Sequence, residues 1–500
     1  MPATKDGALP VRPASPLRCR VQDLLARVPS LRATGPVGDV FVTGCTHDSR
    51  AVQPGDLYAA LPGSRVHGAD FLDAVVAAGA TAVLTDDKGA ERASAYDLVV
   101  LVVPDPRAVL GEVAACIHAD PAASLLTIAI TGTNGKTTTA FLVEAGLRAA
   151  GFTTGLLGTV RTQIADEVLP SVRTTPEATD LQALFAVMRE RGVTAAVVEV
   201  SSHALSLGRV DGVVFDTAVF TNLSQDHLDF HKTMADYEAA KASLFTSARS
   251  RRGVVNVDDP AGRRLLRTAT VPLTTYGEDA DVTVRNLDLR PDGSSFRLAG
   301  QVDVRVQVGL PGAFNVANAT AALTALAVSG VDVAAAAEGI SLLSGIPGRM
   351  ERIDEGQPFL AVVDYAHTPD AVQTLLRAVR GLVGGRVLVV LGCGGDRDAS
   401  KRPLMGAAAV AGADVAVLTS DNPRSEDPLA ILDEMAAGAT GAIVEPDRAT
   451  AIALAVAQAR PGDAVVVAGK GHETGQEAGG IVTPFDDREI LRQALKAVQA

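Results

Sequence analysis

Thr131-Gly132-Thr133-Asn134-Gly135-Lys136-Thr137-Thr138 is the stretch of sequence that decides how the middle of this chain folds. It follows a short apolar run, residues 125–130, that predicts a buried strand, and it opens a predicted helix over residues 139–150. In such a unit the N–H groups of the loop and of the helix start point at an anion, Lys136 reaches phosphate oxygens, and Thr137 can hold Mg²⁺. The stretch therefore predicts a phosphate-binding loop, and the alternative is a plain glycine turn with a surface lysine.

The glycine spacing of this loop departs from the usual pattern. A phosphate-binding loop normally has a further glycine five positions before the Gly-Lys pair. Here that position is Ile130, and only Gly132 precedes Gly135. The prediction therefore rests on strand, loop and helix together and not on the spacing.

Composition narrows the class of protein. The chain has 500 residues, a formal net charge of −13, no tryptophan and four cysteines. This length favours about three domains, and the charge argues against a general nucleic-acid or anionic-membrane surface, which leaves small molecules as the expected partners. The cysteines (Cys19, Cys45, Cys116 and Cys393) are scattered, which indicates reduced thiols in a cytoplasmic protein. No apolar run approaches the ~18 residues that a membrane span needs.

Alternating short strands and helices predict an α/β protein with three domains. We expect a disordered leader over residues 1–16, which carry proline and mixed charge without an apolar core. A small α/β domain is expected over residues 17–120, a central domain over 121–345 and a C-terminal domain over 346–500. In the first domain, the polar loops that hold Ser49 and His67 are either solvated turns or contacts for a nucleotide-linked group.

Two further strands of the central domain end in polar residues. The apolar run over residues 195–200 carries Glu199, and a carboxylate buried late in a strand is costly unless it meets a cation or hydrogen-bond donors. Glu199 is therefore either a Mg²⁺ ligand or part of a buried structural pair. The strand expected over residues 213–220 leads into residues 221–231, where the density of His, Asp and Asn favours a site over a surface loop.

Three other side chains of this domain allow more than one interpretation. Asn315 and Asn318 lie three apart on an alanine-rich helix, so one can cap the helix while the other reaches a purine edge. Lys241 has apolar helical neighbours and by itself is an ordinary snorkelling lysine. The Pro-Asp-Gly turn within residues 281–309 predicts a β-hairpin.

The C-terminal domain repeats one pattern four times, an apolar strand followed by a charged loop. Such strands, separated by helices, predict a doubly wound parallel sheet, and ligands on these sheets bind outside the carboxyl ends of the strands. All four charged loops then share one edge and form a binding wall. The strands are expected at residues 359–363, 386–391, 414–419 and 463–467. The loop after the second, residues 392–395, resembles a dinucleotide-binding loop only weakly.

Together these motifs resemble the ATP-dependent Mur ligases of peptidoglycan synthesis, a family related to the folylpolyglutamate synthases. The motifs that carry the resemblance are residues 131–138, 199–203, 222–229, 348–349 and 364–370, in the order of the family. The resemblance implies a UDP-sugar-binding first domain, a central P-loop-type ATPase domain with a mainly parallel sheet, and a C-terminal Rossmann-like domain that binds an amino acid. It also implies a monomeric, cytoplasmic enzyme of cell wall biogenesis, without nucleic-acid partner or membrane insertion.

The activity implied is the addition of the third stem-peptide residue to UDP-N-acetylmuramoyl-L-alanyl-D-glutamate. ATP would phosphorylate the D-glutamate carboxylate, and the amine of the incoming amino acid would displace phosphate from the acyl phosphate. The resemblance implies ATP and Mg²⁺ as cofactors, and catalytic roles for Lys136, Glu199, His227 and Lys241. It places ATP against Gly132, Thr133, Asn134, Gly135, Lys136, Thr137, Thr138, Asn318, Arg349 and Asp364. Mg²⁺ would be held by Thr137, Glu199, His227 and, as a carbamate, Lys241.

The UDP-sugar contacts implied are Ser49, His67, Thr174, Thr175, Ser201 and Arg209. A plain turn would also account for Thr174 and Thr175, and Leu207 stands where many relatives have Gln, so contacts at that corner differ. Because Arg349 and Asp364 lie on a different domain from the phosphate loop, domain closure must assemble the site, with residues 345–348 as the expected hinge.

The amino-acid contacts implied are Arg397, Asp421, Asn422, Arg424, Gly469 and Glu473. Diaminopimelate differs from lysine by a second carboxylate, which Arg424 can bind bidentately, whereas Glu473 suits the far ammonium. The prediction is therefore diaminopimelate, of either stereoisomer. The alternatives are lysine as the substrate, a folylpolyglutamate synthase-like ligase, and a non-catalytic protein that uses ATP as a switch.

Overall fold

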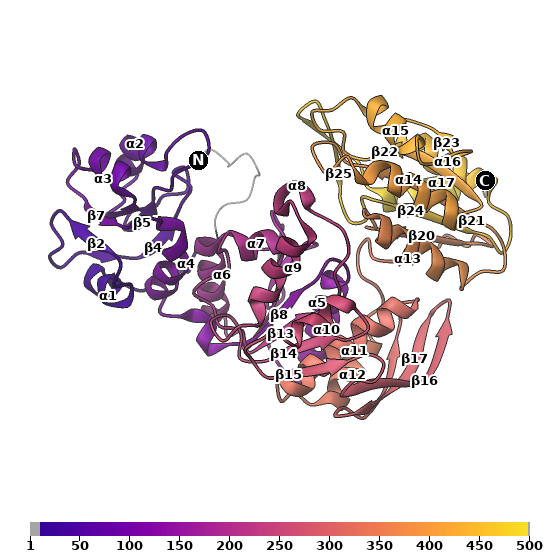
Figure 1. Ribbon diagram of the computed structural model, residues 1–500, viewed down its shortest axis with the longest axis horizontal. Helices are drawn as coiled ribbons and strands as arrows, with labels where there is room; N and C mark the ends of the chain where they lie inside the picture. Colours follow the sequence, from indigo (N-terminus) through magenta and orange to yellow (C-terminus); the bar gives the residue numbers. More distant parts are fainter. Residues whose placement is uncertain (1–10, 499–500) are drawn as a thin grey trace.

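The chain, described over residues 11–498 by a computed structural model, forms three lobes that follow one another along the sequence (Figure 1). Each lobe is built on its own sheet, of five, eleven and six strands in chain order. The central lobe lies between the other two in Figure 1, and the C-terminal lobe, in orange and yellow, lies on the far side from the indigo first lobe. No helix among residues 11–498 is long and apolar enough to cross a membrane.

The first lobe has a five-stranded sheet in the order β2-β7-β6-β5-β4, parallel except where β2 pairs with β7. Its strands are short because they cross a small core, and every residue of β4, β5, β6 and β7 is buried. The strands are β2 (Arg32–Thr34), β4 (Gly44–Thr46), β5 (Asp56–Ala59), β6 (Ala82–Thr85) and β7 (Val99–Val102). The helices are α1 (Val21–Arg27), α2 (Leu72–Ala77), α3 (Asp87–Ala93) and α4 (Pro106–Ile117), and a ribbon pairs β1 (Cys19–Arg20) with β3 (Phe41–Val42).

The expected disordered leader is wrong for residues 11–16, and residues 1–10 lie outside the described part of the chain. The guanidinium of Arg12 donates to Asp56 at 2.9 Å. The backbone amides of Ala14 and Ser15 both donate to Glu190 of the central lobe at 2.8 Å. Composition could not reveal these partners, because they lie 44 to 176 positions away along the chain.

The central lobe has an eleven-stranded sheet with a parallel middle, β9-β12-β8-β13-β14-β15, flanked by antiparallel edges. Near-continuous apolar runs form the middle strands because helices cover both faces. These strands are β8 (Leu126–Thr131), β9 (Thr154–Leu157), β12 (Ala195–Glu199), β13 (Thr217–Phe220), β14 (Gly253–Asn256) and β15 (Leu273–Tyr276). The edge strands are β10 (Thr162–Ile164), β11 (Glu167–Leu169), β16 (Val282–Arg290), β17 (Gly293–Gly300) and β18 (Val304–Val308).

The predicted hairpin is confirmed as β16 and β17, which pair antiparallel and extend the sheet at one edge. Helices of this lobe are α5 (Lys136–Ala149), α6 (Ala178–Glu190), α7 (Ser202–Ser206), α8 (Leu228–His231), α9 (Met234–Ala242), α10 (Pro260–Leu265), α11 (Ala313–Val328) and α12 (Val333–Ser341). Helix α5 begins three residues earlier than the expected Thr139, because Gly135 is left-handed (φ 85°) and turns the chain directly into the helix. Lys136 and Thr137 thus stand in its first turn.

The C-terminal lobe confirms the predicted parallel sheet. Its order is β19-β20-β24-β21-β22-β23, with only β19 antiparallel. The strands are β19 (Glu351–Arg352), β20 (Leu360–Asp364), β21 (Val387–Cys393), β22 (Val415–Ser420), β23 (Ile443–Val444) and β24 (Ala464–Ala468), and a hairpin joins β25 (Gly475–Ala478) to β26 (Ile481–Pro484). The helices are α13 (Pro369–Arg380), α14 (Lys401–Gly412), α15 (Pro428–Ala436), α16 (Arg448–Gln458) and α17 (Asp487–Ala497).

Candidate active site

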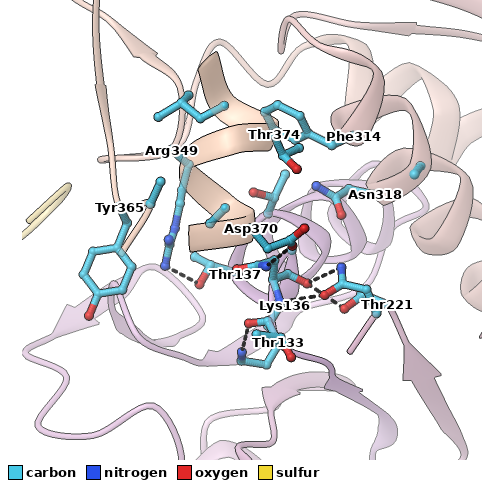
Figure 2. Close-up of a pocket in the computed structure, with 18 of the residues that line it drawn as sticks. Thr133, Lys136, Thr137, Thr221, Phe314, Asn318, Arg349, Tyr365, Asp370 and Thr374 are labelled. Atoms are coloured by element: carbon cyan, nitrogen blue, oxygen red, sulfur yellow. Dashed lines mark hydrogen bonds between the residues drawn. The ribbon is translucent and has the colours of Figure 1, made fainter. Parts of the chain in front are cut away.

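A pocket of about 410 Å³ lies between the central and C-terminal lobes. The phosphate loop, the ends of β12 and β13, and the start of α11 line it from the central lobe. Arg349 and the start of α13, with Asp370 and Thr374, line it from the other side (Figure 2). Asp364 also lines it from that lobe. The carboxyl ends of parallel strands in two separate sheets therefore face one interlobe pocket, which is the position where α/β sheets bind ligands.

The phosphate loop is folded against the loop that follows β13. A side chain at Gly132 would meet the Thr221 hydroxyl at 1.9 Å, and one at Gly135 would meet the Asn318 carbonyl oxygen at 2.4 Å, so glycine is required at both positions. The Lys136 ammonium donates to the carbonyls of Gly132 at 2.9 Å and Thr133 at 2.8 Å. Burial lowers the pKa of Lys136. The loop thus holds one cation at the start of α5, where the helix dipole also favours an anion.

Glu199 ends β12 as a fully buried carboxylate with three donors. The Thr137 hydroxyl donates to it at 2.9 Å, and Thr159 donates from its hydroxyl at 3.0 Å and its backbone amide at 2.9 Å. A carboxylate and a hydroxyl side by side are hard oxygen ligands of the kind Mg²⁺ prefers. The described residues contain no cluster of three His, Cys, Asp or Glu placed to hold a metal. This donor set fits Mg²⁺, which commonly takes one or two protein ligands with phosphate oxygens and water.

Asp226 lies among basic side chains of both lobes. His227 of the central lobe lies 3.4 Å away, and His367 and Lys401 of the C-terminal lobe lie at 3.5 and 3.8 Å. Burial alone would raise the pKa of Asp226, but His367, His227 and Lys401 together hold it below its ordinary value. Burial lowers the pKa of His227, so its imidazole is neutral at pH 7 and able to ligate a metal. His227 lines the pocket, and its role as a metal ligand stays a prediction.

Lys241 is fully buried behind the phosphate loop and does not appear among the residues that line the pocket. Its amine donates to the Gly132 carbonyl at 2.8 Å and lies over the Tyr237 ring. Burial, helped by the neighbouring Lys136 charge, lowers its pKa well below the usual range. An uncharged amine is the form that reacts with carbon dioxide, so the site suits the carbamate implied by the resemblance, which stays a prediction.

Asn318 and Asn315 are both buried at the start of α11. The Asn318 amide donates to Asn315 at 3.1 Å, and its oxygen accepts from Thr139 at 3.4 Å. The expected capping role is not seen, because Gly312 stands at the N-cap and Asn315 donates back to the Pro311 carbonyl. The pair instead fixes the Asn318 side chain against the phosphate loop.

Arg349 reaches across the pocket from the C-terminal lobe. Its guanidinium donates to the Thr137 hydroxyl at 3.1 Å and stacks on the Tyr365 ring at 4.4 Å (Figure 2). Asp364 accepts from the amides of Met350 and Ala366, both at 2.8 Å, and so fixes the segment that carries Arg349. In the expected hinge, a side chain at Gly348 would meet the His472 backbone at 2.1 Å, so this end of the hinge is packed tightly on the C-terminal lobe.

The residues expected to bind the UDP-sugar fall into two groups. Thr174 and Ser201 line the interlobe pocket, while Thr175 is buried beside them and donates to the Glu199 carbonyl at 2.8 Å. Arg209 pairs with Glu177 at 2.9 Å. Ser49 and His67 stand apart in the first lobe, where His67 caps a 3-10 turn and contacts Asp86 at 3.1 Å. Leu207 is the C-cap residue of helix α7, two positions before Arg209.

The six residues expected to bind the amino acid form an amino-acid cluster at the carboxyl edge of the C-terminal sheet. Asn422 follows β22, and its amide donates to Glu473 at 2.7 Å. Gly469 follows β24 with φ 115°, and a side chain there would meet the Asp421 carboxylate at 2.7 Å. The Arg424 guanidinium donates to the Gly395 carbonyl at 2.6 Å, and a side chain at Gly394 would meet it. Arg397 lies within 3.9 Å of the same Gly394 position.

Several residues of these two sites were not predicted. Thr159 holds both Glu199 and Thr174, and it follows the apolar strand β9 just as Glu199 ends β12, which is a signal that the sequence did contain. Asp226, His367 and Asp370 lie within the motifs at residues 222–229 and 364–370. No role was predicted for these three side chains from the sequence. Lys470 lies between two predicted residues and is fully buried against Asn422 and Glu473. Most of their contacts join segments distant in sequence, although Glu473 lies only three residues from Lys470.

Three family descriptions match the chain in order. They are "Mur ligase family, catalytic domain" over residues 41–117, "Mur ligase middle domain" over residues 130–326, and "Mur ligase, glutamate ligase domain" over residues 348–471. A relative from Streptomyces coelicolor, named UDP-N-acetylmuramoyl-L-alanyl-D-glutamate--2,6-diaminopimelate ligase, is 58% identical over 97% of this chain and 99% of its own.

Solved structures agree in fold. A UDP-N-acetylmuramoyl-L-alanyl-D-glutamate--2,6-diaminopimelate ligase superposes with a TM-score of 0.65 at 37% identity, covering 92% of this chain and 96% of the other. A folylpolyglutamate synthase from Mycobacterium tuberculosis, complexed with ADP and AMPPCP, gives a TM-score of 0.59 at 20% identity and covers 73% of this chain and 92% of its own.

Proposed function

This chain belongs to the Mur ligase family, and on that premise we propose that it is an ATP-dependent ligase. It joins 2,6-diaminopimelate to the D-glutamate carboxylate of UDP-N-acetylmuramoyl-L-alanyl-D-glutamate. The observation that carries the proposal is the interlobe pocket, in which the phosphate loop of one lobe meets Arg349 of the next. The amino-acid cluster, which lies on the lobe that contributes Arg349, supports the choice of the second substrate.

The reaction has two steps. The D-glutamate carboxylate attacks the γ-phosphorus of ATP, forms an acyl phosphate and releases ADP. The amine of diaminopimelate then attacks the acyl carbon, loses a proton and displaces inorganic phosphate, which leaves an amide. Phosphoryl transfer concentrates negative charge, so positioned cations and backbone donors account for most of the catalysis.

The chain's own residues divide this work. Lys136 exchanges its loop carbonyls for phosphate oxygens, because an ammonium gains more from charged acceptors than from neutral ones. Arg349 contacts the same region from the C-terminal lobe, and the Asn318 side chain approaches the adenine. Gly132, Thr133, Asn134, Gly135 and Thr138 supply the backbone and side chains of the cradle, and Asp364 holds the Arg349 segment in place.

Mg²⁺ fits the oxygens of Thr137 and Glu199, and when bound it neutralises charge on the phosphates. His227, neutral in its buried position, and Lys241, as a carbamate, would be further ligands. Thr159 holds the Glu199 carboxylate in place from two sides. This second donor pair limits the rotation of Glu199 and so keeps one oxygen beside Thr137.

The sugar nucleotide is proposed to extend from the first lobe to the pocket. Ser49 and His67 would contact it in the first lobe, and Thr174, Thr175, Ser201 and Arg209 would contact it where the central lobe begins. Because Thr174 and Ser201 line the same pocket as the phosphate loop, a carboxylate bound there approaches the γ-phosphate. Both lobes that line the pocket belong to one chain, which supports a monomeric enzyme. The proposed reaction requires ATP, which supports a cytoplasmic location.

The alternatives make different predictions. Lysine as substrate would leave the Arg424 guanidinium without its carboxylate partner, which costs binding energy. A folylpolyglutamate synthase activity would not use the nucleotide-sugar contacts proposed for Ser49 and His67 in the first lobe. A non-catalytic switch would hydrolyse or bind ATP without either second substrate.

The decisive experiment is phosphate release by the purified chain with ATP and Mg²⁺, with and without each substrate. We expect release only when UDP-N-acetylmuramoyl-L-alanyl-D-glutamate and diaminopimelate are both present, and the tripeptide product in the mass spectrum. Phosphate release that needs neither substrate would reject the ligase, and equal turnover of lysine would reject the amino-acid assignment. Separate assays with meso- and LL-diaminopimelate identify the isomer.

A further inference from the structure

Lys470 is a buried cation at the centre of the amino-acid cluster, and nothing in the proposed reaction uses it. Its side chain has no solvent exposure. The ammonium has three donors, and each has a partner: the Asn422 side-chain oxygen at 3.0 Å, the Glu473 carboxylate at 3.2 Å and the Gly475 carbonyl at 2.7 Å. A buried ammonium is costly unless it is fully paired, so this geometry is retained only with all three partners in place.

The three partners of Lys470 come from two segments. Asn422 follows β22, whereas Glu473 and Gly475 lie three and five residues after Lys470, where the chain leads from β24 into the β25–β26 hairpin. Further bonds close the network: the Asn422 amide donates to Glu473 at 2.7 Å, and its oxygen also accepts from the Glu477 backbone amide at 3.0 Å. Both polar ends of the Asn422 amide are therefore assigned, and Lys470 and the Glu477 amide together fix which end faces Glu473.

The hairpin in turn holds Arg424. The Arg424 backbone is left-handed (φ 55°), a costly conformation for a residue with a side chain. It is held there because its amide donates to the Glu477 carbonyl at 2.9 Å and its carbonyl accepts from Gly479 at 2.6 Å. A two-stranded hairpin alone is only marginally stable, so its attachment through Gly475 to Lys470 matters.

We infer that Lys470 is a positioning residue for the amino-acid substrate, which orients Asn422 and Glu473 and anchors the hairpin that holds Arg424. This inference rests on the proposed function, since it assigns the cluster to diaminopimelate. Lys470 does not touch the substrate. It acts by holding Glu473 and Arg424 at a set separation, so that Glu473 can receive an ammonium of the substrate and Arg424 a carboxylate.

The test compares Lys470→Met with the matched control Lys496→Met, an exposed lysine whose side chain is 63% accessible. In the full-length chain, Lys470→Met is expected to raise the KM for diaminopimelate about 10- to 100-fold, because hydrogen bonds of a charged group are lost. The KM values for ATP and for the UDP-linked substrate are expected to stay within about twofold. Lys496→Met is expected to change none of the three.

A double-mutant cycle separates positioning from a general structural role. If Lys470 acts through Asn422, Lys470→Met combined with Asn422→Ala raises the KM no further than the more severe single change. The inference would be overturned if the fold-increases in the KM for diaminopimelate of the two single variants multiplied in the double variant. It would also be overturned by an equal rise in all three KM values or by an unchanged KM for diaminopimelate. Lys470→Gln, which keeps a donor without the charge, is measured in parallel. If neither variant gives a wild-type near-ultraviolet spectrum, Lys470 is a folding residue and the inference is rejected.

The proposed function can fail separately. If the wild-type chain shows no phosphate release that depends on diaminopimelate, the function is wrong. If the wild type depends on diaminopimelate but Lys470→Met keeps the wild-type KM, only the role of Lys470 is wrong.

A second, independent observation concerns two thiols of the first lobe. The sulfurs of Cys19, in β1, and Cys116, in the last turn of α4, lie 4.0 Å apart. Cys19 is buried, and Cys116 is half-buried and so accessible to a small oxidant. The sequence indicated scattered thiols, but the fold brings this pair together across 97 positions. Cys45 and Cys393 are buried, and neither has such a cysteine contact among the described residues.

We propose that Cys19 and Cys116 are a site of reversible disulfide formation by a small-molecule disulfide. The Cys116 thiolate attacks the disulfide and releases one small thiolate. The Cys19 thiol loses its proton to water, its sulfur attacks the Cys116 sulfur, and the second small thiolate leaves. Two protein thiols are oxidised to one S–S bond and one small disulfide is reduced to two thiols. The new bond would tie the β1–β3 ribbon to α4.

The test treats the native full-length chain with oxidised glutathione, alkylates the remaining thiols after unfolding and maps peptides without reduction. We expect one linked peptide pair, Cys19 with Cys116, with Cys45 and Cys393 alkylated as internal controls. In Cys19→Ser, Cys116 should retain glutathione as a mixed disulfide. A wild-type chain that keeps glutathione on Cys116 without the internal link, or that leaves all four thiols free, would overturn the proposal.

Discussion

The Arg349 guanidinium donates a hydrogen bond of 3.1 Å to the Thr137 hydroxyl, although 212 positions of sequence separate the two residues. The Thr137 hydroxyl in turn donates to Glu199 at 2.9 Å. One side chain of the C-terminal lobe is therefore connected to the buried carboxylate of the central lobe through a single threonine. Any change in the relative orientation of the two lobes must alter this chain of hydrogen bonds, so substitution of Arg349 or Glu199 should have a large effect.

Replacing Arg349 by alanine should weaken ATP use. Loss of a guanidinium that faces the phosphate site should lower kcat/KM for ATP about 10- to 1,000-fold, because charge stabilisation in phosphoryl transfer is lost. Steady-state phosphate release measures the effect. Arg352→Ala is the matched control, since Arg352 lies three positions away, is 55% exposed and pairs with the exposed Asp354. Equal loss in both variants would contradict a specific role for Arg349.

Replacing Glu199 by glutamine should weaken the response to Mg²⁺. The amide keeps the size of the side chain but removes the negative charge, so the Mg²⁺ concentration for half-maximal activity should rise at least tenfold. Glu144→Gln is the control, because Glu144 is also buried in the central lobe but pairs with Arg148 and Thr154. A normal Mg²⁺ titration in Glu199→Gln would indicate that Glu199 is a structural group held by Thr137 and Thr159.

Gly135→Ala should abolish ATP binding, and the backbone strain of an alanine at this left-handed position should not be the main cause. The new methyl group would lie 2.4 Å from the Asn318 oxygen and displace it from the loop. Gly151→Ala is a close match, because Gly151 has a similar φ of 88° but nothing within 4 Å. Both variants should lose about 1 kcal/mol of stability, and only Gly135→Ala should lose ATP binding in calorimetry. Retained binding would show that the loop shifts freely.

Arg424→Ala should reduce the preference for diaminopimelate over lysine. The guanidinium is the group that a second carboxylate would pair with, and losing a bidentate pair costs about 1.5–3 kcal/mol, or roughly 10- to 100-fold in relative kcat/KM. Competition between the two amino acids, followed by product mass, measures the ratio. Arg460→Ala, an exposed arginine of the same lobe, is the control. An unchanged ratio would remove Arg424 from the specificity site.

Acid should destabilise the chain through His118. This imidazole is 2% exposed at the end of α4, and burial lowers its pKa from 6.5 to about 4. Between these two values the unfolded chain binds a proton that the folded chain does not. The free energy of unfolding therefore carries no penalty from His118 above pH 6.5. It decreases as the pH falls toward 4, by at most about 3 kcal/mol.

Urea unfolding at pH 7.5 and 4.5 tests this effect. His118→Leu replaces the titrating imidazole by an apolar side chain, so its loss of stability on acidification should be smaller than that of the wild type. The same loss in both proteins would assign the acid sensitivity to other groups.

The sequence by itself determined the local elements of this protein. Strand β8, the phosphate loop and the helix that follows are specified by neighbouring residues, because apolar periodicity and glycine act over a few positions. The same local rules predicted the four parallel strands of the C-terminal lobe, and their carboxyl ends placed Asp421, Asn422 and Gly469 at one edge. The start of α5 was misplaced by three residues, since the left-handed Gly135 is a property of the folded loop.

Only the tertiary structure decided which of these edges meet. The contacts of Arg349 with Thr137, of Asp226 with His367 and Lys401, and of Arg12 with Asp56 join segments far apart in sequence, and no local pattern encodes them. Lys470 was not predicted because its burial and its bond to Asn422, 48 positions away, arise only in the folded chain, although its other partners Glu473 and Gly475 are local. Local propensity fixes the elements, whereas the packing of apolar faces fixes which polar ends converge.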